Sequence, residues 1–232
     1  MEIAVDLHIH SALSPCADDE MSPNNIVNMA ILKELDAIAV TDHNSCDNIE
    51  AILKVADSKI LIVPGMEVQT KEEVHLLCYF KNVENLLEFG GLIKNKLPDI
   101  MNVAKIFGNQ LIMNEFDETI GERECMLISS VDLSMDEVLE EVSTRDGIIV
   151  PAHVDRHSFS VISQLGFIPD NFKKGMLEVN RNGRGIPFDY PKEKLYYSSD
   201  AHNLSQILER ETYLEVSDLS INEILRKLSG EN

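Results

Sequence analysis

Short apolar runs typical of β-strands alternate along most of the chain with stretches whose apolar residues recur at helical spacing. Strands are predicted at residues 3–10, 37–41, 60–63, 74–80, 147–152, 176–179, 195–199 and 212–216. Helices are predicted from Ser22 to about residue 34, over residues 48–56, from Ser134 onward, and at the end of the chain over Ile221, Ile224, Leu225 and Leu228. Strands that alternate with helices indicate βα units around a parallel sheet, which is an α/β fold.

This alternation breaks between residue 81 and about residue 131, where glycines, Pro98 and an acidic stretch interrupt it. We interpret the segment as an insertion in a single domain, forming a lid or a wall of the site. Without it about 180 residues are left, whereas a barrel of eight βα units needs about 250. A TIM-like barrel of about seven units is therefore the predicted architecture.

The formal net charge is −20, from 40 acidic and 20 basic residues. Such a surface repels a phosphate backbone, so extended nucleic acid is not expected as a ligand. A small phosphorylated substrate is compatible with this charge, because bound cations dominate the field inside a site.

The four cysteines, Cys16, Cys46, Cys78 and Cys125, form no CxxC pair and no disulfide-like spacing. They are typical of reduced thiols in a cytosolic protein. The first residues lack the basic flank and long apolar core of a signal peptide, and no apolar run approaches the length of a membrane span. We therefore expect a cytoplasmic protein with no membrane partner, and the sequence leaves its oligomeric state open.

Six of the seven histidines lie in short motifs that also contain carboxylates, and most of these motifs end or follow a predicted strand. The candidate metal ligands are His8, His10, Asp18, His43, Glu67, His75, His153, Asp200 and His202. Imidazole and carboxylate together are the ligands that Zn, Mn and Fe take in proteins. Each motif alone is commonly structural, but buried imidazoles and carboxylates are costly without partners, so their joint occurrence favours a multi-metal hydrolytic site.

The spacing of the motifs predicts how some of these side chains meet. His8 and His10 stand two residues apart on a strand and project from one face, which Asp6 would share and where it could orient an imidazole. Glu67 and His75 are placed symmetrically about residue 71, so a short hairpin would bring them face to face.

In order, these motifs resemble those of the PHP (polymerase and histidinol phosphatase) superfamily: HxH, a D-H pair, E followed by H, and a late D-x-H. Here they read His8/His10, Asp42-His43, Glu67 with His75 and His153, and Asp200/His202. The stretch Ala17-Asp18-Asp19-Glu20-Met21-Ser22-Pro23 resembles the family's S-D-G-E-L-T-P, which assigns the loop ligand to Asp18. One departure is Ser14-Pro15-Cys16, which lengthens the loop before Asp18.

The resemblance implies a distorted (β/α)7 barrel, a trinuclear site and phosphoesterase chemistry. It suggests that one metal is held by His8, His10, Glu67 and Asp200, a second by Glu67, His75 and His153, and a third by Asp18, His43 and His202. Two to three divalent ions, Mn, Zn or Fe, are thus the expected cofactors.

Hydrolysis in such a site needs no protein nucleophile, and we find neither a GxSxG elbow nor a Walker-type phosphate loop. Positive charge would stabilise the transition state, and the candidates for it are Arg156, Arg181 and Arg184. We interpret His157 as an exposed loop residue. Because ligand histidines must be neutral to bind, metal affinity and activity should fall below about pH 6.

The sequence therefore favours a metal-dependent phosphoesterase acting on small esters, such as a nucleotide, a short oligonucleotide, or a sugar or amino-alcohol phosphate. A non-catalytic, metal-bound regulatory or binding module is the alternative from another class. An amidohydrolase-type barrel ranks lower, because that class often bridges its metals with a carboxylated lysine, whereas the bridging position here is Glu67.

Overall fold

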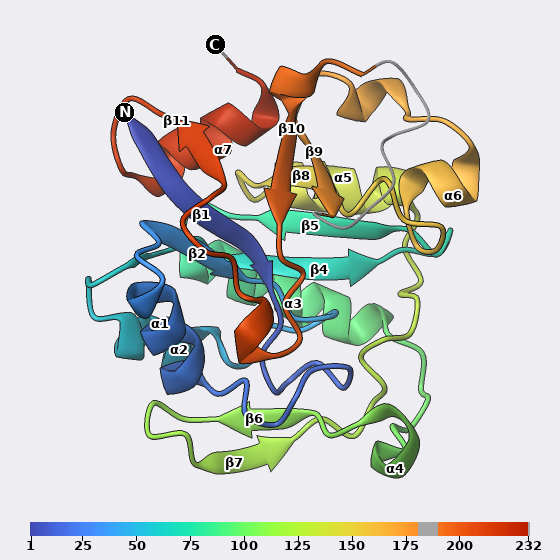
Figure 1. The fold of residues 1–232 in the computed structure, drawn as a ribbon. Coiled ribbons are helices and arrows are strands. Elements are labelled where there is room, and N and C mark those ends of the chain that lie inside the picture. Colours follow the sequence, from blue (N-terminus) through green and yellow to red (C-terminus); the bar gives the residue numbers. More distant parts are fainter. Residues whose placement is uncertain (181–189, 232) are drawn as a thin grey trace.

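The computed structural model describes residues 1–180 and 190–231, which have a mixed α/β fold (Figure 1). The strands are β1 (Glu2–Ile9), β2 (Ala37–Val40), β3 (Leu61–Ile62), β4 (Gly65–Gln69), β5 (His75–Tyr79), β6 (Leu111–Met113), β7 (Thr119–Glu122), β8 (Ile148–Pro151), β9 (Leu177–Asn180), β10 (Leu195–Ser198) and β11 (Tyr213–Glu215). The α-helices are α1 (Pro23–Leu32), α2 (Ile49–Ala56), α3 (Val83–Lys96), α4 (Ala104–Phe107), α5 (Met135–Ser143), α6 (Val161–Leu165) and α7 (Ile221–Ser229). Every predicted strand overlaps an observed one, while β4, β6 and β7 were not predicted. Arg181 and Arg184 lie outside the described residues.

Within the described ranges the strands form four separate sheets, not one closed ring. The prediction of parallel strands is confirmed for β1–β2–β3 and for β9–β10. The hairpin expected between Glu67 and His75 forms as β4–β5, whereas the prediction of parallel strands is wrong for β5–β8 and for β1–β11, which pair antiparallel. Single parallel bridges, Ile9 to Ala201 and His43 to Glu67, link neighbouring sheets at the carboxyl ends of β1, β2 and β10.

Strand β1 changes the face that its side chains present. Before the change Ile3, Val5 and Leu7 belong to an inner apolar cluster, which also includes Leu77, Tyr79 and Val150 between the strands. A register shift against β2 lies between Asp6 and Ile9, and Ile9 belongs to an outer cluster that packs the strands against α1, α2, α3 and α5. Because such a shift moves the alternation of side chains by one residue, His8 and His10 point to the same side of the strand as Leu7. They lie closer to the carboxyl end of β1 than Leu7 does.

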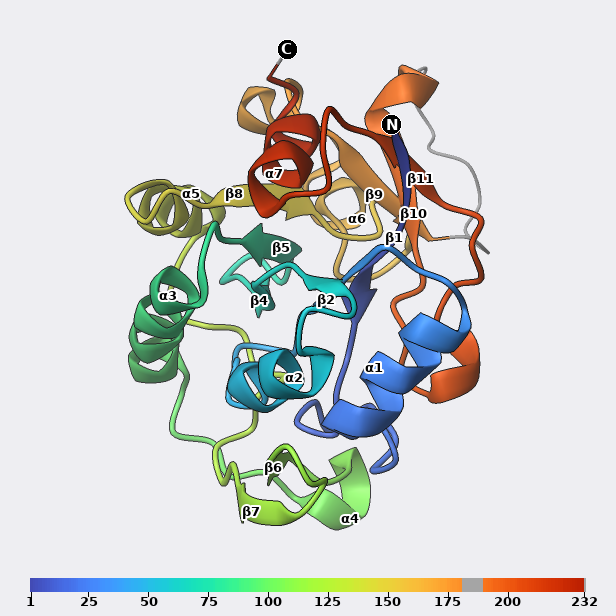
Figure 2. The ribbon, with the colours of Figure 1, turned by 90° about the vertical axis from the view of Figure 1, so that its left-hand side faces the viewer.

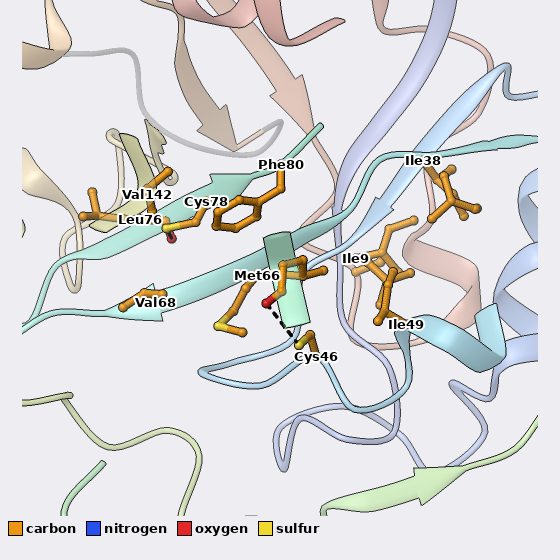
Figure 3. Packing of buried hydrophobic residues seen from close by; sticks show 14 of the residues in the cluster. Ile9, Ile38, Cys46, Ile49, Met66, Val68, Leu76, Cys78, Phe80 and Val142 are labelled. Atoms are coloured by element: carbon orange, nitrogen blue, oxygen red, sulfur yellow. Dashed lines mark hydrogen bonds between the residues drawn. The ribbon is translucent and has the colours of Figure 1, made fainter. Parts of the chain in front are cut away.

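The β4–β5 hairpin separates the site from the outer cluster by simple alternation. Met66 and Val68 of β4, with Leu76 and Cys78 of β5, point into the outer cluster (Figure 3). Burying an apolar side chain of this size stabilises the fold by about 1.5–3 kcal/mol. If the hairpin presented its opposite face to the outer cluster, several of these contributions to stability would be lost. Glu67, between Met66 and Val68, is thereby fixed on the opposite face.

The predicted insertion begins with a regular helix. Helix α3 follows β5 and buries Leu86, Phe89 and Ile93 in the outer cluster, so the irregular part of the segment starts after Lys96. Gly90 was read as interrupting the pattern, but it sits inside α3, where a Cβ would lie 2.7 Å from Cys46 Sγ. The glycine thus allows close packing against the loop before α2 and does not end the helix.

The rest of the insertion, with α4 and the β6–β7 hairpin, lies beyond the carboxyl end of β1 (Figures 1 and 2). Leu111 donates its backbone N–H to Ala12 O at 2.8 Å, which ties the hairpin to the loop after β1. Asn44 donates its side-chain amide to the carbonyls of Leu127 and Ser129, at 2.6 and 2.9 Å. The insertion is therefore attached to the loops that carry the site. Among the helices described, not one combines the length and apolarity needed to cross a bilayer.

Candidate metal centre

The predicted ligands other than Asp18 converge on the carboxylates of Glu67 and Asp200, both buried. The Glu67 oxygens lie 2.9 Å from His43 Nδ1, 2.9 Å from His75 Nδ1, 3.3 Å from His153 Nε2, 3.4 Å from His8 Nε2 and 3.5 Å from His10 Nε2. Asp200 Oδ1 lies 3.3 Å from His8 Nε2 and 3.1 Å from His10 Nε2. Side chains from strands far apart in sequence thus share one small volume.

This volume contains three sets of potential ligands, and within each set the ligand atoms all lie within 4.8 Å of one another. They are His8, His10 and Asp200; His43, Glu67 and His75; and His10, His43 and His202. His10 and His43 each belong to two sets, as expected where neighbouring ions share their surroundings.

Two of the imidazoles are oriented by acceptors outside this volume. His8 Nδ1 lies 2.9 Å from Glu178 Oε1, so the imidazole donates this N–H to the carboxylate. His10 Nδ1 lies 3.0 Å from Ser14 Oγ, and the Ser14 hydroxyl itself donates to Asp42 Oδ1 at 2.7 Å. The Ser14 oxygen must then accept from His10, which places the proton of His10 on Nδ1 and leaves Nε2 free.

Two further imidazoles are held in the same way. His75 Nε2 lies 3.1 Å from Gln69 Oε1, which leaves His75 Nδ1 directed at Glu67. His202 Nδ1 donates to the backbone carbonyl of Asp200 at 2.8 Å, so Nε2 is the nitrogen available as a ligand atom. Outer acceptors of this kind are the usual companions of metal-binding histidines, because they fix the tautomer and raise the basicity of the ligand nitrogen.

The atoms that face inward fit a cation. His43 Nδ1 and Glu67 Oε2 lie 2.9 Å apart, yet in the described part of the chain neither has a hydrogen-bond partner. His8 Nε2 and His10 Nε2 lie 3.1 Å apart, although both rings direct their Nδ1 to an outer acceptor. Without an ion, these close contacts require additional protons on His8 and His43, and a divalent ion would take the place of those protons. The donor set therefore suits divalent metal ions.

Charges in this volume perturb one another strongly. Burial raises the pKa of the Glu67 carboxyl, but the His75, His43 and His8 imidazoles outweigh this, and the pKa lies well below its usual range. Burial lowers the pKa of His8 and of His43, but nearby carboxylates, chiefly Glu178 for His8 and Glu67 for His43, outweigh it and raise both values well above the usual range. Burial lowers the pKa of His75 to about 4.

Metal binding is accordingly expected to release protons at pH 7. His8 and His43 have raised pKa values and hold protons in the metal-free protein, and an ion must displace them. Affinity should therefore weaken as pH falls, beginning above the ordinary histidine pKa and not at about pH 6 as the sequence suggested. Calorimetric titration with Zn²⁺ in buffers of different ionisation enthalpy measures this release, and no net release at pH 7 would contradict it.

Several predicted residues occupy other positions. Asp18 is exposed and enters none of the three ligand sets found among the described residues. Asp6 accepts backbone N–H groups from Ser199 and Leu208 and does not orient an imidazole, because the bulge after it turns His8 to the other face. His157 is exposed, as expected.

The hairpin register also differs from the prediction. Glu67 pairs with Leu77 and Gln69 with His75, so the strands are symmetric about residue 72 and not residue 71. The turn ends with Glu73 at φ 59° and a bond from Thr70 N–H to Val74 O, which sets this register. His75 meets Glu67 as a diagonal neighbour on the same face.

Arg156 lies at the rim of the centre. Its Nη1 is 2.7 Å from Asp200 Oδ2, and its side chain is 42% exposed. One guanidinium edge is held by Asp200 while the rest faces solvent.

Glu178 is the functional residue that sequence analysis missed. It is buried on β9, where Oε1 accepts from His8 and Oε2 accepts the backbone N–H of His153 at 2.7 Å. Its signal was an acidic residue inside the apolar run Leu177-Glu178-Val179, which is rare in a buried strand without a partner.

Replacing Glu178 by glutamine is expected to weaken metal affinity about 10- to 100-fold, the usual cost of losing an outer partner of a ligand. An amide keeps the shape but offers one acceptor oxygen where the carboxylate offers two. Competition with a chromogenic chelator measures the affinity. Glu215→Gln, an exposed strand glutamate on β11, is the matched control. Equal affinity in the wild type and Glu178→Gln would show that Glu178 does not orient His8.

Cys16 was not among the predicted ligands. The residue as a whole is exposed, but its thiol interacts with His43 and His202. Burial would raise the pKa of this thiol, but the charge of His43 and hydrogen bonds with His202 and His43 lower it to about 6.

Solved structures share this fold. Endonuclease Q from Pyrococcus furiosus, described as a lesion-specific endonuclease, is 23% identical, with a TM-score of 0.72 over 100% of this chain and 57% of that one. A candidate metal-dependent phosphoesterase from Bifidobacterium adolescentis is 14% identical, with a TM-score of 0.54 over 97% of this chain and 94% of that one. An uncharacterized protein of Methanocaldococcus jannaschii is 26% identical over 163 residues, 70% of this chain and 18% of that protein. The chain thus spans little more than half of endonuclease Q and a smaller part of the archaeal protein.

The expectation that extended nucleic acid is not a ligand is contradicted by this comparison. A second endonuclease Q structure, 22% identical with a TM-score of 0.73 over 100% of this chain and 57% of that chain, contains a 27-mer duplex substrate with an abasic lesion at the active site. The prediction took the net charge of the whole chain as decisive. Bound cations and local charge decide whether a phosphate is admitted, so an acidic average does not exclude DNA.

The family model described as PHP domain matches residues 6–181, more than two thirds of the chain, and this range includes seven of the nine predicted ligands. The match fits the ordered His and carboxylate motifs and the centre they build. The chain belongs to the PHP domain family.

Proposed function

We propose that this chain hydrolyses nucleotide phosphoesters at a centre of two or three divalent ions. The ions would be held by His8, His10, His43, Glu67, His75, His153, Asp200 and His202. The observation that carries the proposal is the set of imidazoles whose outer nitrogens are bound to Glu178, Ser14, Gln69 and the Asp200 carbonyl while their inner nitrogens converge. With it we propose the distorted (β/α)7 arrangement for the surrounding strands.

The residues of this chain would fix the geometry of the reaction. When bound, divalent ions in such a site lower the pKa of water and neutralise charge on phosphate oxygens. Glu67 contacts imidazoles that follow β1, β2 and β8, and also the imidazole that begins β5. It would therefore be a ligand shared between neighbouring ions. Outer hydrogen bonds hold the rings, so little reorganisation is needed as charge develops on the substrate.

Arg156 would place positive charge at the rim, next to a phosphate bound at the ions. Arg156→Ala is expected to lower kcat/KM about 10²- to 10³-fold, the usual cost of losing a donor to the transition state, without loss of bound metal. Arg210→Ala is the matched control, because Arg210 is 39% exposed and also pairs with an aspartate, Asp36. Equal kinetics for Arg156→Ala and the wild type would remove Arg156 from the mechanism.

The test of the proposed function is an assay of phosphate ester cleavage by protein loaded with Mn²⁺ or with Zn²⁺. The substrates are mononucleotides, dinucleotides and a DNA duplex with an abasic site, and His43→Ala is the control. Metal-dependent cleavage that is lost in the variant supports the proposal, and the preferred substrate distinguishes small esters from DNA. Tightly bound ions without turnover of any of these esters would favour the metal-bound binding module.

A further inference from the structure

The loop between β1 and α1 carries Cys16 to the edge of the centre. Ser14 Oγ accepts the backbone N–H of His43 at 3.1 Å, and Asp18 donates its own backbone N–H to the carbonyl of His202 at 2.8 Å. Cys16 stands midway between these two anchors, one on each histidine, and Ala17 N–H closes a turn on Ser14 O at 2.9 Å. The loop is thereby bound to both histidines.

The insertion holds this loop from the other side. Gly108, at φ +102°, lies so close to the loop that a Cβ there would come within 1.9 Å of the Pro15 carbonyl oxygen. Asn109 donates its side-chain amide to Asp19 Oδ2 at 2.7 Å. With Pro15 and Asp19 fixed, the thiol between them is set beside the imidazoles of His43 and His202, with which it interacts.

The histidines that Cys16 faces form an incomplete set of ligands. The ligand nitrogens of His10, His43 and His202 lie within 4.8 Å of one another. His10 and His43 are buried. Three imidazoles leave a tetrahedral ion one further position, which water or another protein ligand would occupy. Asp18, the carboxylate expected there, and Cys16 both lie outside this set and are exposed, but Cys16 interacts with His43 and His202.

We propose that the Cys16 thiolate is the additional ligand of the ion held by His10, His43 and His202. The loop lengthened by Ser14-Pro15-Cys16 presents sulfur where the sequence motif led us to expect the Asp18 carboxylate. Thiolate favours soft or borderline ions over Mg²⁺ or Mn²⁺, so this position would select Zn²⁺ or Fe²⁺. The inference rests on the proposed metal centre.

Cobalt spectroscopy tests the inference without measuring activity. The stripped, reduced protein is titrated with Co²⁺ under anaerobic conditions, and the near-ultraviolet thiolate-to-cobalt charge-transfer band is recorded. Bound cobalt is counted by elemental analysis. We expect the band in the wild type and in Cys125→Ser, and its loss in Cys16→Ser together with at least about tenfold weaker binding of one ion.

Cys16→Asp separates ligation from folding. It should bind as much cobalt as the wild type but without the band, because a carboxylate takes the place of the thiolate. Wild-type protein that binds cobalt without the band, or Cys16→Ser that keeps it, would overturn the assignment of Cys16 while leaving the metal centre intact. Failure of the wild type to bind cobalt at all would overturn the proposed centre, and the inference with it.

Discussion

Glu67→Gln is expected to lower kcat/KM by about 10³-fold or more. Glu67 contacts five imidazoles from different parts of the chain, through both carboxylate oxygens. The amide keeps the volume of the side chain but removes its charge and one acceptor oxygen. A 10³-fold loss corresponds to about 4 kcal/mol of transition-state stabilisation. A loss of this size is expected when the ions that polarise the phosphate lose a shared ligand.

The variant is compared with the wild type in metal-dependent cleavage of the preferred ester and in metal content after dialysis. Glu140→Gln, on the exposed face of α5, is the control for losing one negative charge from an acidic protein. A Glu67→Gln enzyme with activity within a few fold of the wild type would exclude Glu67 as a bridging ligand.

Removing the metal is expected to lower the melting temperature by about 5–15 °C. Ligand at 100 to 1,000 times its Kd stabilises the native state by about 2.7–4.1 kcal/mol, and each kcal/mol moves the melting temperature of a chain of this size by roughly 2–4 °C. Without ions, buried Glu67 and Asp200 rely on protonated imidazoles for compensation. Scanning calorimetry of chelator-treated protein, before and after Zn²⁺ is returned, measures the shift.

The control for this measurement is Glu67→Gln, in which added Zn²⁺ should restore much less of the lost stability. A wild-type melting temperature that does not change with chelator or with added ions would mean that the native state binds no stabilising metal.

The strands and most of the centre were predictable because they follow from local rules. Apolar runs such as Ala37–Val40 are too short for a helix and are bounded by polar residues, which favours strands, and the polar residues that follow such runs gather at one end of a sheet. His43, Asp200 and His202 all follow a strand in this way. Each motif alone is commonly structural, and it was the occurrence of all of them together that was informative.

The errors arose where a single backbone feature changed a face or a register. The bulge in β1 turns His8 and Asp6 to opposite sides, and Glu73 in the left-handed region shifts the β4–β5 register by one residue about its centre. Neither event has a strong local signal. Cys16 and Glu178 were missed for a different reason: their roles depend on contacts 27 and 170 residues away.

The metal centre can be observed in a crystal structure of the protein incubated with Zn²⁺, with anomalous differences measured above the zinc absorption edge. We expect two or three anomalous peaks among Glu67, Asp200 and the six imidazoles, with the outer hydrogen bonds to Glu178, Ser14 and Gln69 preserved. A cluster without anomalous density, or zinc bound only at other places on the surface, would contradict this expectation.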